Sequence, residues 1–232
     1  MRVWVIGAGG QAGRALLASA PAGMMVTSST SAECDLRDAP AVARFASQCQ
    51  PQLIINAAAY TAVDAAEQDA DAAFAVNGAA VGTLRDVAQQ VGARLVHLST
   101  DFVFDGTATA PYAPDAERCP INIYGASKAS GEDEAGPDAL IVRTAWLYDG
   151  AGRNFLTTML RLMREQPALR VVADQIGTPT ATTTLAAAIW ALAGQGATGV
   201  FHVTDSGATS WHDFAVAISE EALALGLLSA AV

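Results

Sequence analysis

The sequence begins with a short apolar run, RVWVI at residues 2–6, that leads directly into the glycine-rich stretch GAGGQAG at residues 7–13. Gly7, Gly10 and Gly13 give the pattern G-x-x-G-x-x-G. A tight strand-to-helix turn without side chains lets a pyrophosphate approach the backbone N–H groups at the helix N-terminus, where the helix dipole favours negative charge. The opening therefore predicts a strand, a phosphate-binding turn and a helix, although a tight turn without a ligand gives the same pattern.

The rest of the chain alternates apolar runs with Ala-rich helical stretches. The apolar runs are at residues 2–6, 23–28, 52–56, 94–98, 139–143, 169–172 and 199–203, and the helical patterns at 11–20, 39–49, 71–91, 121–135, 154–165, 182–194 and 211–225. Buried parallel strands read as continuous apolar runs, so this order predicts an α/β fold with a doubly wound parallel sheet of the Rossmann type. We expect a dinucleotide-binding core over residues 1–144. Residues 145–232 should form a small substrate-binding lobe, and some strands and helices of this stretch should pack with the core.

Composition narrows the classes of function. The chain has 232 residues, of which 52% are hydrophobic, enough to bury the core of one α/β domain with a small appendage. The net charge of −10 argues against nucleic acid and membrane as partners, because both reward basic surfaces. The sequence has no secretory signal, no apolar stretch of about 18 residues and no CxxC pair. We therefore expect a cytoplasmic protein with reduced cysteines, and the scattered histidines indicate no metal site.

The end of the second predicted strand bears on cofactor choice. In dinucleotide-binding folds a carboxylate about 20 residues after the glycines binds the adenosine ribose. Here the strand ends in VTSST at residues 26–30, without Asp or Glu. A hydroxyl-rich end tolerates a 2′-phosphate better than a carboxylate would, so the sequence favours NADP(H) and leaves NADH open. Asp35 falls where the next loop of such folds often touches the adenine.

The stretch INIYGASKASGE at residues 121–132 contains the only lysine of the chain, Lys128, four residues after Tyr124. Residues i and i+4 lie on one face of a helix, one turn apart. A tyrosine has a pKa near ~10, which a nearby ammonium and the positive nicotinamide ring of an oxidised cofactor would lower. A lysine also gives ribose hydroxyls a compact donor that the planar fork of arginine does not reproduce. The alternative is a solvated lysine beside a packing tyrosine.

Two other predicted strands end in residues suited to a ligand. LSTDFVFDG at residues 98–106 offers three polar side chains, Ser99, Thr100 and Asp101. A hydroxyl there can hydrogen-bond a substrate carbonyl oxygen as negative charge develops on it. NAAAYTAVDAAEQ at residues 56–68 places three alanines after a strand, where a cofactor could pass close to the backbone. Helix propensity explains the alanines equally well.

Together these stretches resemble the extended short-chain dehydrogenase/reductases, and within them the dTDP-4-dehydrorhamnose reductase family. The matching segments run in family order to about residue 222: GAGGQAG, NAAAYTAVDAAEQ, LSTDFVFDG, INIYGASKASGE, RTAWLY, VVADQIGTPT and GVFHVTDSGATSWHDFA. The last three are more diagnostic than the glycines, which many cofactor folds share. The resemblance implies that NADPH or NADH reduces the 4-keto group of dTDP-4-dehydrorhamnose, a dTDP-sugar, to give dTDP-L-rhamnose.

The resemblance also implies roles for single residues. Thr100 would orient the carbonyl, Tyr124 would donate the proton, and Lys128 would lower the tyrosine pKa and hold the ribose. The cofactor would contact Gly7, Gly10, Gln11, Ala12, Gly13, Asp35, Leu36, Ala57, Ala58, Ala59, Tyr60, Tyr124 and Lys128. The sugar nucleotide would contact Val63, Thr100, Asp101, Phe102, Trp146 and Asn154. The indole of Trp146 suits the C–H-rich face of a deoxysugar, and core packing explains it equally well.

The sequence departs from the family pattern at its end. The family normally continues past SWHDFA with a Pro/Arg-rich segment, whereas this sequence stops at ALALGLLSAAV. We therefore expect an intact cofactor half and an incomplete nucleotide-sugar side, and a homodimer stays open. One alternative function is a non-catalytic NADP-binding module, for which the regulatory β subunit of methionine adenosyltransferase is a precedent. The other is a reductase or epimerase of another nucleotide sugar, although epimerases lack DQIGTPT and TSWHDF.

Overall fold

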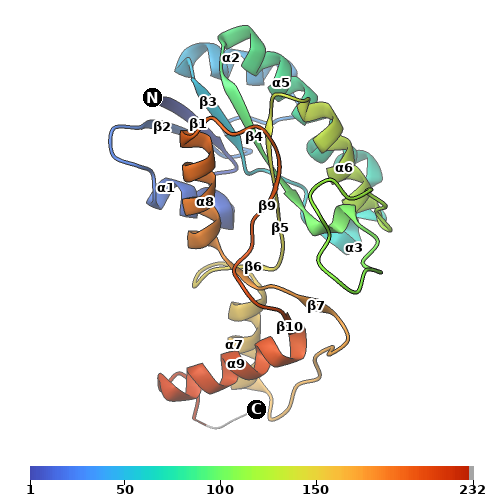
Figure 1. Ribbon diagram of the computed structural model, residues 1–232. Helices are drawn as coiled ribbons and strands as arrows, with labels where there is room; N and C mark the ends of the chain where they lie inside the picture. The colour runs from blue at the N-terminus through green and yellow to red at the C-terminus, as the bar shows by residue number, and fades with distance from the viewer. Residues whose placement is uncertain (230–232) are drawn as a thin grey trace. The chain divides into compact units, whose positions relative to one another are not determined.

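The computed structural model describes residues 1–229 (Figure 1). The chain forms two compact units. The first, which we call the core unit, comprises residues 1–144 and 186–203, and the second, the lobe unit, comprises residues 145–185 and the chain from residue 204 onward. The stretch 186–203 thus belongs with the first 144 residues, so the chain leaves the core unit and returns to it.

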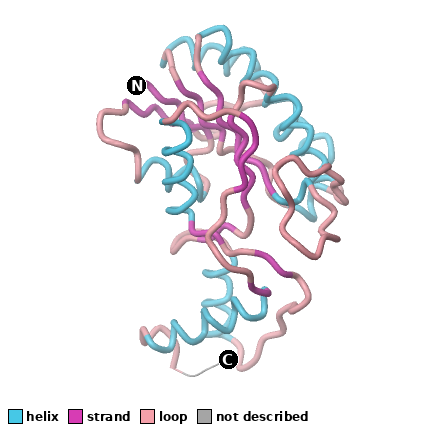
Figure 2. Tube along the Cα trace, viewed as in Figure 1, coloured by secondary structure: helices cyan, strands magenta, loops and turns pink. Residues whose placement is uncertain are grey.

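A six-stranded parallel sheet with strand order β2-β1-β3-β4-β5-β9 forms the centre of the core unit (Figure 2). Its strands are β1 (Arg2–Ile6), β2 (Met25–Ser29), β3 (Leu53–Asn56), β4 (Arg94–Thr100), β5 (Leu140–Thr144) and β9 (Gly199–His202). The central strand β3 is buried along its whole length, as expected for a parallel sheet covered on both faces. The predicted doubly wound α/β fold is confirmed.

Helices cover both faces of this sheet (Figure 1). On one face lie α2 (Ala39–Cys49), α5 (Ala80–Val91) and α6 (Ile123–Ala135), and on the other lie α1 (Gln11–Ala18) and the core-unit part of α8 (Thr182–Gly194). The indole N–H of Trp190 donates to the Leu16 carbonyl at 3.2 Å and so joins α8 to α1. Buried side chains such as Trp4, Val42 and Leu84 fill the space between the sheet and its helices.

The helix predicted over residues 71–91 is divided into three parts. These are α4 (Ala70–Phe74), a π-helical turn η1 (Ala75–Ala79) and α5, and the short α3 (Val63–Ala66) precedes them. Asn77 lies in the π-helical turn and exchanges two hydrogen bonds with the backbone of Tyr60. Turns of this kind are frequent at functional sites, and a helix periodicity alone does not reveal them.

The lobe unit contains α7 (Phe155–Glu165) and α9 (Trp211–Ala224), which enclose an apolar cluster that includes Met159, Met163 and Ile218. Its short strands are β6 (Leu147–Tyr148), β7 (Ile176–Gly177), β8 (Thr180–Ala181) and β10 (Thr209–Ser210), paired as β6–β8 and β7–β10. The strand predicted at residues 169–172 is wrong, because this segment is a loop in which Val172 is 51% exposed. Over residues 1–229, no helix is both long and apolar enough to cross a membrane.

Candidate active site

Close backbone packing shapes the glycine turn between β1 and α1. Gly7 has a φ of +81°, and a Cβ there would lie 2.6 Å from the backbone nitrogen of Ala58. A Cβ on Gly13 would collide with the Gly7 carbonyl oxygen. Both glycines are therefore required for the strand, the turn and the helix to meet, whether or not a ligand binds.

The N-terminus of α1 nevertheless suits an anionic ligand. Gly10 is the N-cap residue and offers no side chain to the first-turn N–H groups, so these donors remain available to a phosphate. Gln11, Ala12 and Gly13 are the first helical residues. The Gln11 Oε1 atom is buried and has no hydrogen-bond partner within residues 1–229. This arrangement fits a ligand that brings both phosphate oxygens and hydrogen-bond donors, as a dinucleotide does.

A carboxylate lies at the end of β2, contrary to the expectation from VTSST. The amide and hydroxyl of Thr30 donate to Glu33 Oε2 at 2.8 and 2.9 Å, and these bonds lower the pKa of Glu33. The Thr30 methyl would lie 3.9 Å from a Cβ on Gly9, so this end of β2 adjoins the glycine turn. The sequence does not single out Glu33, because this residue lies four positions after β2 and its side chain reaches the end of the strand only when the loop folds back.

The predicted adenine residues have other partners within the chain. Hydrogen bonds from Arg37 lower the pKa of Asp35 to about 2, and their ion pair measures 2.7 Å between Nη2 and Oδ2. The side chain of Leu36 is buried in the core cluster, so its backbone is the part left to meet a ligand. The contact of these two residues with adenine stays a prediction.

The segment after β3 is held by Asn77. The Tyr60 N–H donates to Asn77 Oδ1 at 2.8 Å, and Asn77 Nδ2 donates to the Tyr60 carbonyl at 3.0 Å and to Ser127 Oγ at 3.0 Å. Asn77 therefore ties the segment that ends at Tyr60 to the helix α6. The sequence signal for it, an Asn-Gly pair within a helical pattern, is visible only in retrospect.

The structure brings Thr100 and Tyr124 together where β4 ends and α6 begins. Asn122 caps α6 by accepting a hydrogen bond from the Gly125 N–H at 2.7 Å. A Cβ on Gly125 would collide with the Phe102 carbonyl, so only glycine allows this close approach. The Tyr124 ring packs edge-on against Phe102 with centroids 5.5 Å apart. The Thr100 side chain is near enough to the phenol to lower its pKa, and the Thr100 hydroxyl donates to Asp101 Oδ1 at 3.0 Å.

Burial raises the pKa of Tyr124 to about 12, and the Asp101 carboxylate contributes to the rise, while the Thr100 side chain opposes it. This direction is opposite to the lowering that the sequence suggested. The phenol loses solvent in the folded chain, and the sequence pattern does not report that loss. The chain's own residues thus keep Tyr124 protonated, which is the form that a proton donor needs.

Lys128 is 2% exposed, so the alternative of a solvated helix lysine is wrong. Its Nζ donates to the Leu98 carbonyl at 2.6 Å and lies 3.3 Å from His97 Nε2. Burial lowers the pKa of Lys128 to about 8, and the Glu132 carboxylate, one turn further along α6, opposes this. The lysine can therefore exchange its proton close to neutral pH.

A buried charge cluster anchors α6, and the sequence alone does not single it out. Arg143, on β5, donates to Glu132 through Nε and Nη2 at 2.8 and 2.6 Å and to the Pro114 carbonyl at 3.0 Å. Ser99 and Arg118 also donate to the Glu132 carboxylate. The cluster ties the helix that carries the tyrosine and the lysine to the sheet and to the preceding loop.

Two of the predicted substrate residues belong to the lobe unit. Trp146 has a φ of +48°, stacks on Trp211 with centroids 3.5 Å apart, and lies against Gly177, where a Cβ would come within 2.5 Å of its ring. Asn154 caps α7, with Oδ1 accepting from Thr157 N at 3.0 Å. A substrate would compete with these internal contacts. Val63, in the core unit, is half-buried at the start of α3.

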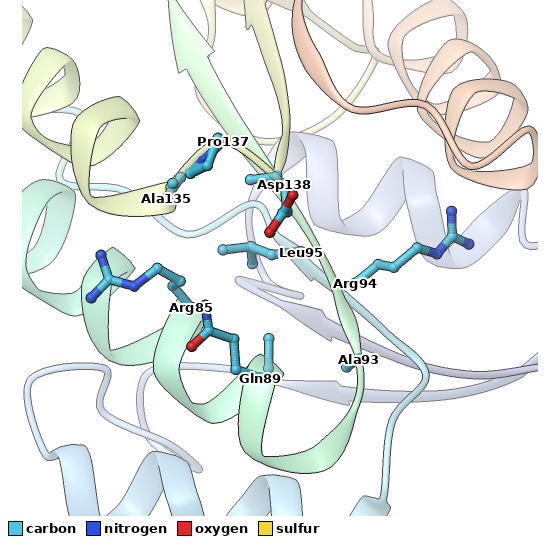
Figure 3. Close-up of a pocket in the computed structure, with 11 residues that line it drawn as sticks. Arg85, Gln89, Ala93, Arg94, Leu95, Ala135, Pro137 and Asp138 are labelled. Carbon is cyan, nitrogen blue, oxygen red and sulfur yellow. The ribbon is translucent and has the colours of Figure 1, made fainter.

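Figure 3 shows a pocket of about 160 Å³ that is lined by residues including Arg94 and Asp138. Arg94 begins β4 and Asp138 precedes β5, so the pocket lies at the N-terminal ends of the strands. Ligands of open α/β sheets bind beyond the opposite, carboxyl ends, where Thr100 and Tyr124 lie. The pocket is therefore separate from the predicted site.

The chain is similar to known proteins over nearly its whole length. Residues 1–230 match the family model described as RmlD substrate binding domain. The dTDP-4-dehydrorhamnose reductase of Burkholderia thailandensis is 45% identical over 230 residues, which cover 94% of this chain and 77% of that protein. The crystal structure of dTDP-4-dehydrorhamnose reductase from Bacillus anthracis in complex with NADP superposes with a TM-score of 0.93 at 38% identity, covering 96% of this chain and 80% of that one.

A more distant likeness supports the fold alone. The NAD complex of UDP-glucose 4-epimerase from Thermus thermophilus has a TM-score of 0.82 at 22% identity, over 96% of this chain and 83% of that one. The chain spans roughly four fifths of the length of these relatives. At 22% identity the likeness confirms the Rossmann-type architecture and says nothing of the reaction.

Proposed function

The chain belongs to the family of the RmlD substrate binding domain, and on that premise we propose that it reduces dTDP-4-dehydrorhamnose with NADPH to dTDP-L-rhamnose. The observation that carries the proposal is the meeting of Thr100 and Tyr124 at the carboxyl end of β4, with Lys128 buried one turn along the same helix. A relative at 45% identity bears the name of this reductase, and a related structure holds NADP.

NADPH, when bound, would supply the hydride that forms the new C–H bond at C4 of the sugar, and the electron pair of the carbonyl π bond would pass to the oxygen. Tyr124 gives its phenolic proton to the resulting oxygen, which becomes the new hydroxyl, and is left as a phenolate. The Thr100 hydroxyl orients that oxygen and stabilises the charge that develops on it. Burial supports this role, because it keeps Tyr124 protonated until the proton is needed.

The proposed cofactor contacts are those of the glycine turn and of the segment after β3. The first-turn N–H groups of α1, from Gln11 onward, would hold the pyrophosphate, and the small residues 57–59 would let the cofactor lie close to the backbone. Lys128 would hold the ribose. The Glu33 carboxylate beside Thr30 would repel a 2′-phosphate and so weaken the preference for NADPH, and NADH is therefore expected to serve as a second hydride donor.

On the substrate side, Val63, Asp101 and Phe102 of the core unit are proposed to contact the sugar nucleotide. In the lobe unit, Trp146 would offer its indole face and Asn154 its amide. Because Trp146 already stacks on Trp211 and Asn154 caps α7, their substitution would also disturb the lobe. Their binding roles are best tested by substrate titration on folded variants.

A spectrophotometric assay tests the proposal. Purified protein mixed with NADPH and dTDP-4-dehydrorhamnose should consume the nicotinamide absorbance. Tyr124→Phe should lower kcat by about 10²–10⁴-fold, the usual contribution of a general acid, while calorimetry finds NADPH binding retained. Tyr112→Phe is the matched control, since within residues 1–229 the hydroxyl of that phenol hydrogen-bonds the loop residues Asp105 and Ala108 and no other group. Unchanged turnover in Tyr124→Phe would contradict the proposed role.

The same assay separates the alternatives. Dinucleotide binding without turnover of any dTDP-, UDP- or GDP-ketosugar would favour a non-catalytic binding module. Faster turnover of a UDP- or GDP-sugar would favour a reductase of another nucleotide sugar.

We place the reaction in the cytoplasm, because Cys34, Cys49 and Cys119 form no disulfide in the described chain. Light scattering would test the homodimer.

A further inference from the structure

A chain of buried polar groups lies beneath Lys128 and has no part in the reaction proposed so far. Asn56 ends β3, His97 is its partner across the sheet on β4, and both are fully buried. The Ala58 N–H donates to Asn56 Oδ1 at 3.1 Å, and Asn56 Nδ2 lies 3.2 Å from His97 Nδ1. His97 Nε2 in turn lies 3.3 Å from Lys128 Nζ.

The direction of these hydrogen bonds follows from the fixed donor at one end. The Ala58 backbone N–H can only donate, so Asn56 presents its carbonyl oxygen to Ala58 and its NH₂ group to the imidazole. His97 Nδ1 must then accept. Burial holds the pKa of His97 well below its usual value, and a charge on Lys128 lowers it further, so the ring is neutral and has a single proton whichever form the lysine takes. That proton is on Nε2, which faces Lys128.

A proton on Nε2 has a consequence for the lysine. A neutral amine has a lone pair that can accept a hydrogen bond from the His97 Nε2–H. An ammonium has no lone pair, so its N–H groups would face another donor. We propose that Asn56 and His97 are positioning residues that stabilise the neutral amine of Lys128, so that Lys128 can release a proton in each catalytic cycle. The use of that proton rests on the proposed reductase function, whereas the hydrogen-bond arrangement does not.

The proton released by Lys128 has a defined destination. After Tyr124 has protonated the sugar oxygen, its phenolate must regain a proton before the next cycle. Nζ and the phenol oxygen share no hydrogen bond in residues 1–229, so a hydroxyl group or a water between them would relay the proton. One Nζ–H bond breaks and its proton joins the bridging oxygen, which gives its own proton to the phenolate. The electron pair stays on Nζ, where it accepts the Nε2–H of His97. A proton from water then restores the ammonium. The Leu98 carbonyl keeps its hydrogen bond from Nζ in both forms.

Other groups around Lys128 act in the opposite direction or not at all. Glu132, on the same face of α6, favours the ammonium. Tyr124 also lies on this face and is neutral until it has given up its proton. The π-helical turn η1, which packs against α6, consists of AVNGA and has no titratable side chain. Burial opposes Glu132 and accounts for the lowered pKa of Lys128, and His97 is the buried ring that faces Nζ at 3.3 Å.

The single lysine makes this inference directly measurable. Protein labelled with ¹³C-lysine gives one side-chain signal, whose pH titration reports Lys128 alone. We expect a midpoint near pH 8. Long-range ¹⁵N spectra of labelled histidine should show His97 protonated on Nε2 above that midpoint. A midpoint within about half a unit of the ordinary lysine value, or a proton on Nδ1 above the midpoint, would overturn the inference.

Asn56→Asp tests the same point in a variant of equal shape. The new carboxylate still accepts from Ala58 and also accepts from His97, which moves the ring proton to Nδ1 and leaves Nε2 as an acceptor for the ammonium. The Lys128 midpoint should rise by at least about one pH unit, and kcat should fall by up to about tenfold. Gln90→Glu, which adds the same charge on an exposed position of α5, should change neither.

The two readouts separate the inference from simpler explanations. If Asn56→Asp raises the Lys128 midpoint while the His97 proton stays on Nε2, the new carboxylate acts on Lys128 by its charge alone. That result would refute the role of His97. If Asn56→Asp does not fold, the tautomer and titration of the parent protein still decide. Because neither spectrum requires turnover, an inactive parent with the expected spectra would contradict the reductase and leave the hydrogen-bond arrangement intact.

Discussion

Replacement of Arg143 by methionine should destabilise the protein by about 3–5 kcal/mol, the usual effect of removing one partner of a buried ion pair. Arg143 and Glu132 are 5% and 3% exposed, and the guanidinium makes two of the hydrogen bonds that the carboxylate accepts. Without it, the buried Glu132 carboxylate loses two hydrogen bonds and its nearest opposite charge. Arg118 remains at 3.2 Å and is 28% exposed, so it compensates partly and favours the lower end of the range.

Urea unfolding followed by tryptophan fluorescence and circular dichroism measures this loss. For a chain of this size, about 3 kcal/mol corresponds to a fall in Tm of roughly 6–12 °C. The matched control is Arg161→Met, because Arg161 pairs with Glu165 at 2.6 Å on the surface of α7, with both side chains more than half exposed. An exposed pair contributes about 0–1 kcal/mol, so the control should be close to the parent.

The double variant Arg143→Met, Glu132→Met tests the cause of the loss. With both charges gone, no buried charge lacks a partner, and the double variant should be more stable than Arg143→Met alone by at least about 2 kcal/mol. Equal losses in Arg143→Met and Arg161→Met would show that water reaches the pair. A double variant that loses the sum of both single changes would show that the carboxylate is not the source of the penalty.

Gly13→Ala should weaken NADPH binding at least about tenfold in calorimetry, because its Cβ would collide with the Gly7 carbonyl, while Gly194→Ala, in open space, should not. Lys128→Arg should lower kcat at least about tenfold with the fold retained, and an arginine variant as active as the parent would contradict the need for a compact amine. Below pH 8 Lys128 is protonated in both the folded and the unfolded chain, so the cost of burying its charge lowers the free energy of unfolding by its full amount. Between pH 8 and 10.5 the folded chain has lost this proton while the unfolded chain keeps it, so the free energy of unfolding rises with pH. Relative to Lys128→Met, the parent should therefore gain up to about 3 kcal/mol of unfolding free energy over that range, measured by urea unfolding.

Local signals in the sequence predict much of the fold. The bounds of α2 and α8 agree with the predicted helices, and β1 agrees with the predicted strand. Asp38 accepts a hydrogen bond from Ala41 N and so begins α2 where its apolar periodicity starts. The spacing of Tyr124 and Lys128 also identified the helix face of the site. These features depend on neighbours within one or two turns, which a single sequence contains.

The missing parts of the site depend on contacts between segments that lie far apart in the chain. Asn77 acts on Tyr60, seventeen residues earlier, and His97 acts on Lys128, thirty-one residues later. No periodicity distinguishes a buried polar side chain that meets such a partner from one that faces solvent. The raised pKa of Tyr124 has the same origin, because the loss of solvent around the phenol is decided by tertiary packing.

The use of lysine at position 128, in a chain with twelve arginines, now has two separate physical reasons. The first is space, because Nζ lies within 2.6 Å of the Leu98 carbonyl in a place with almost no solvent. The second is protonation, since burial can bring a lysine pKa near neutrality, while a guanidinium stays charged in any protein environment. An arginine could supply a fixed charge beside Tyr124, but it could neither accept the Nε2–H of His97 nor return a proton to the phenolate. If Lys128 only held the ribose, the first reason would suffice and the buried Asn56–His97 pair would have no function in the cycle.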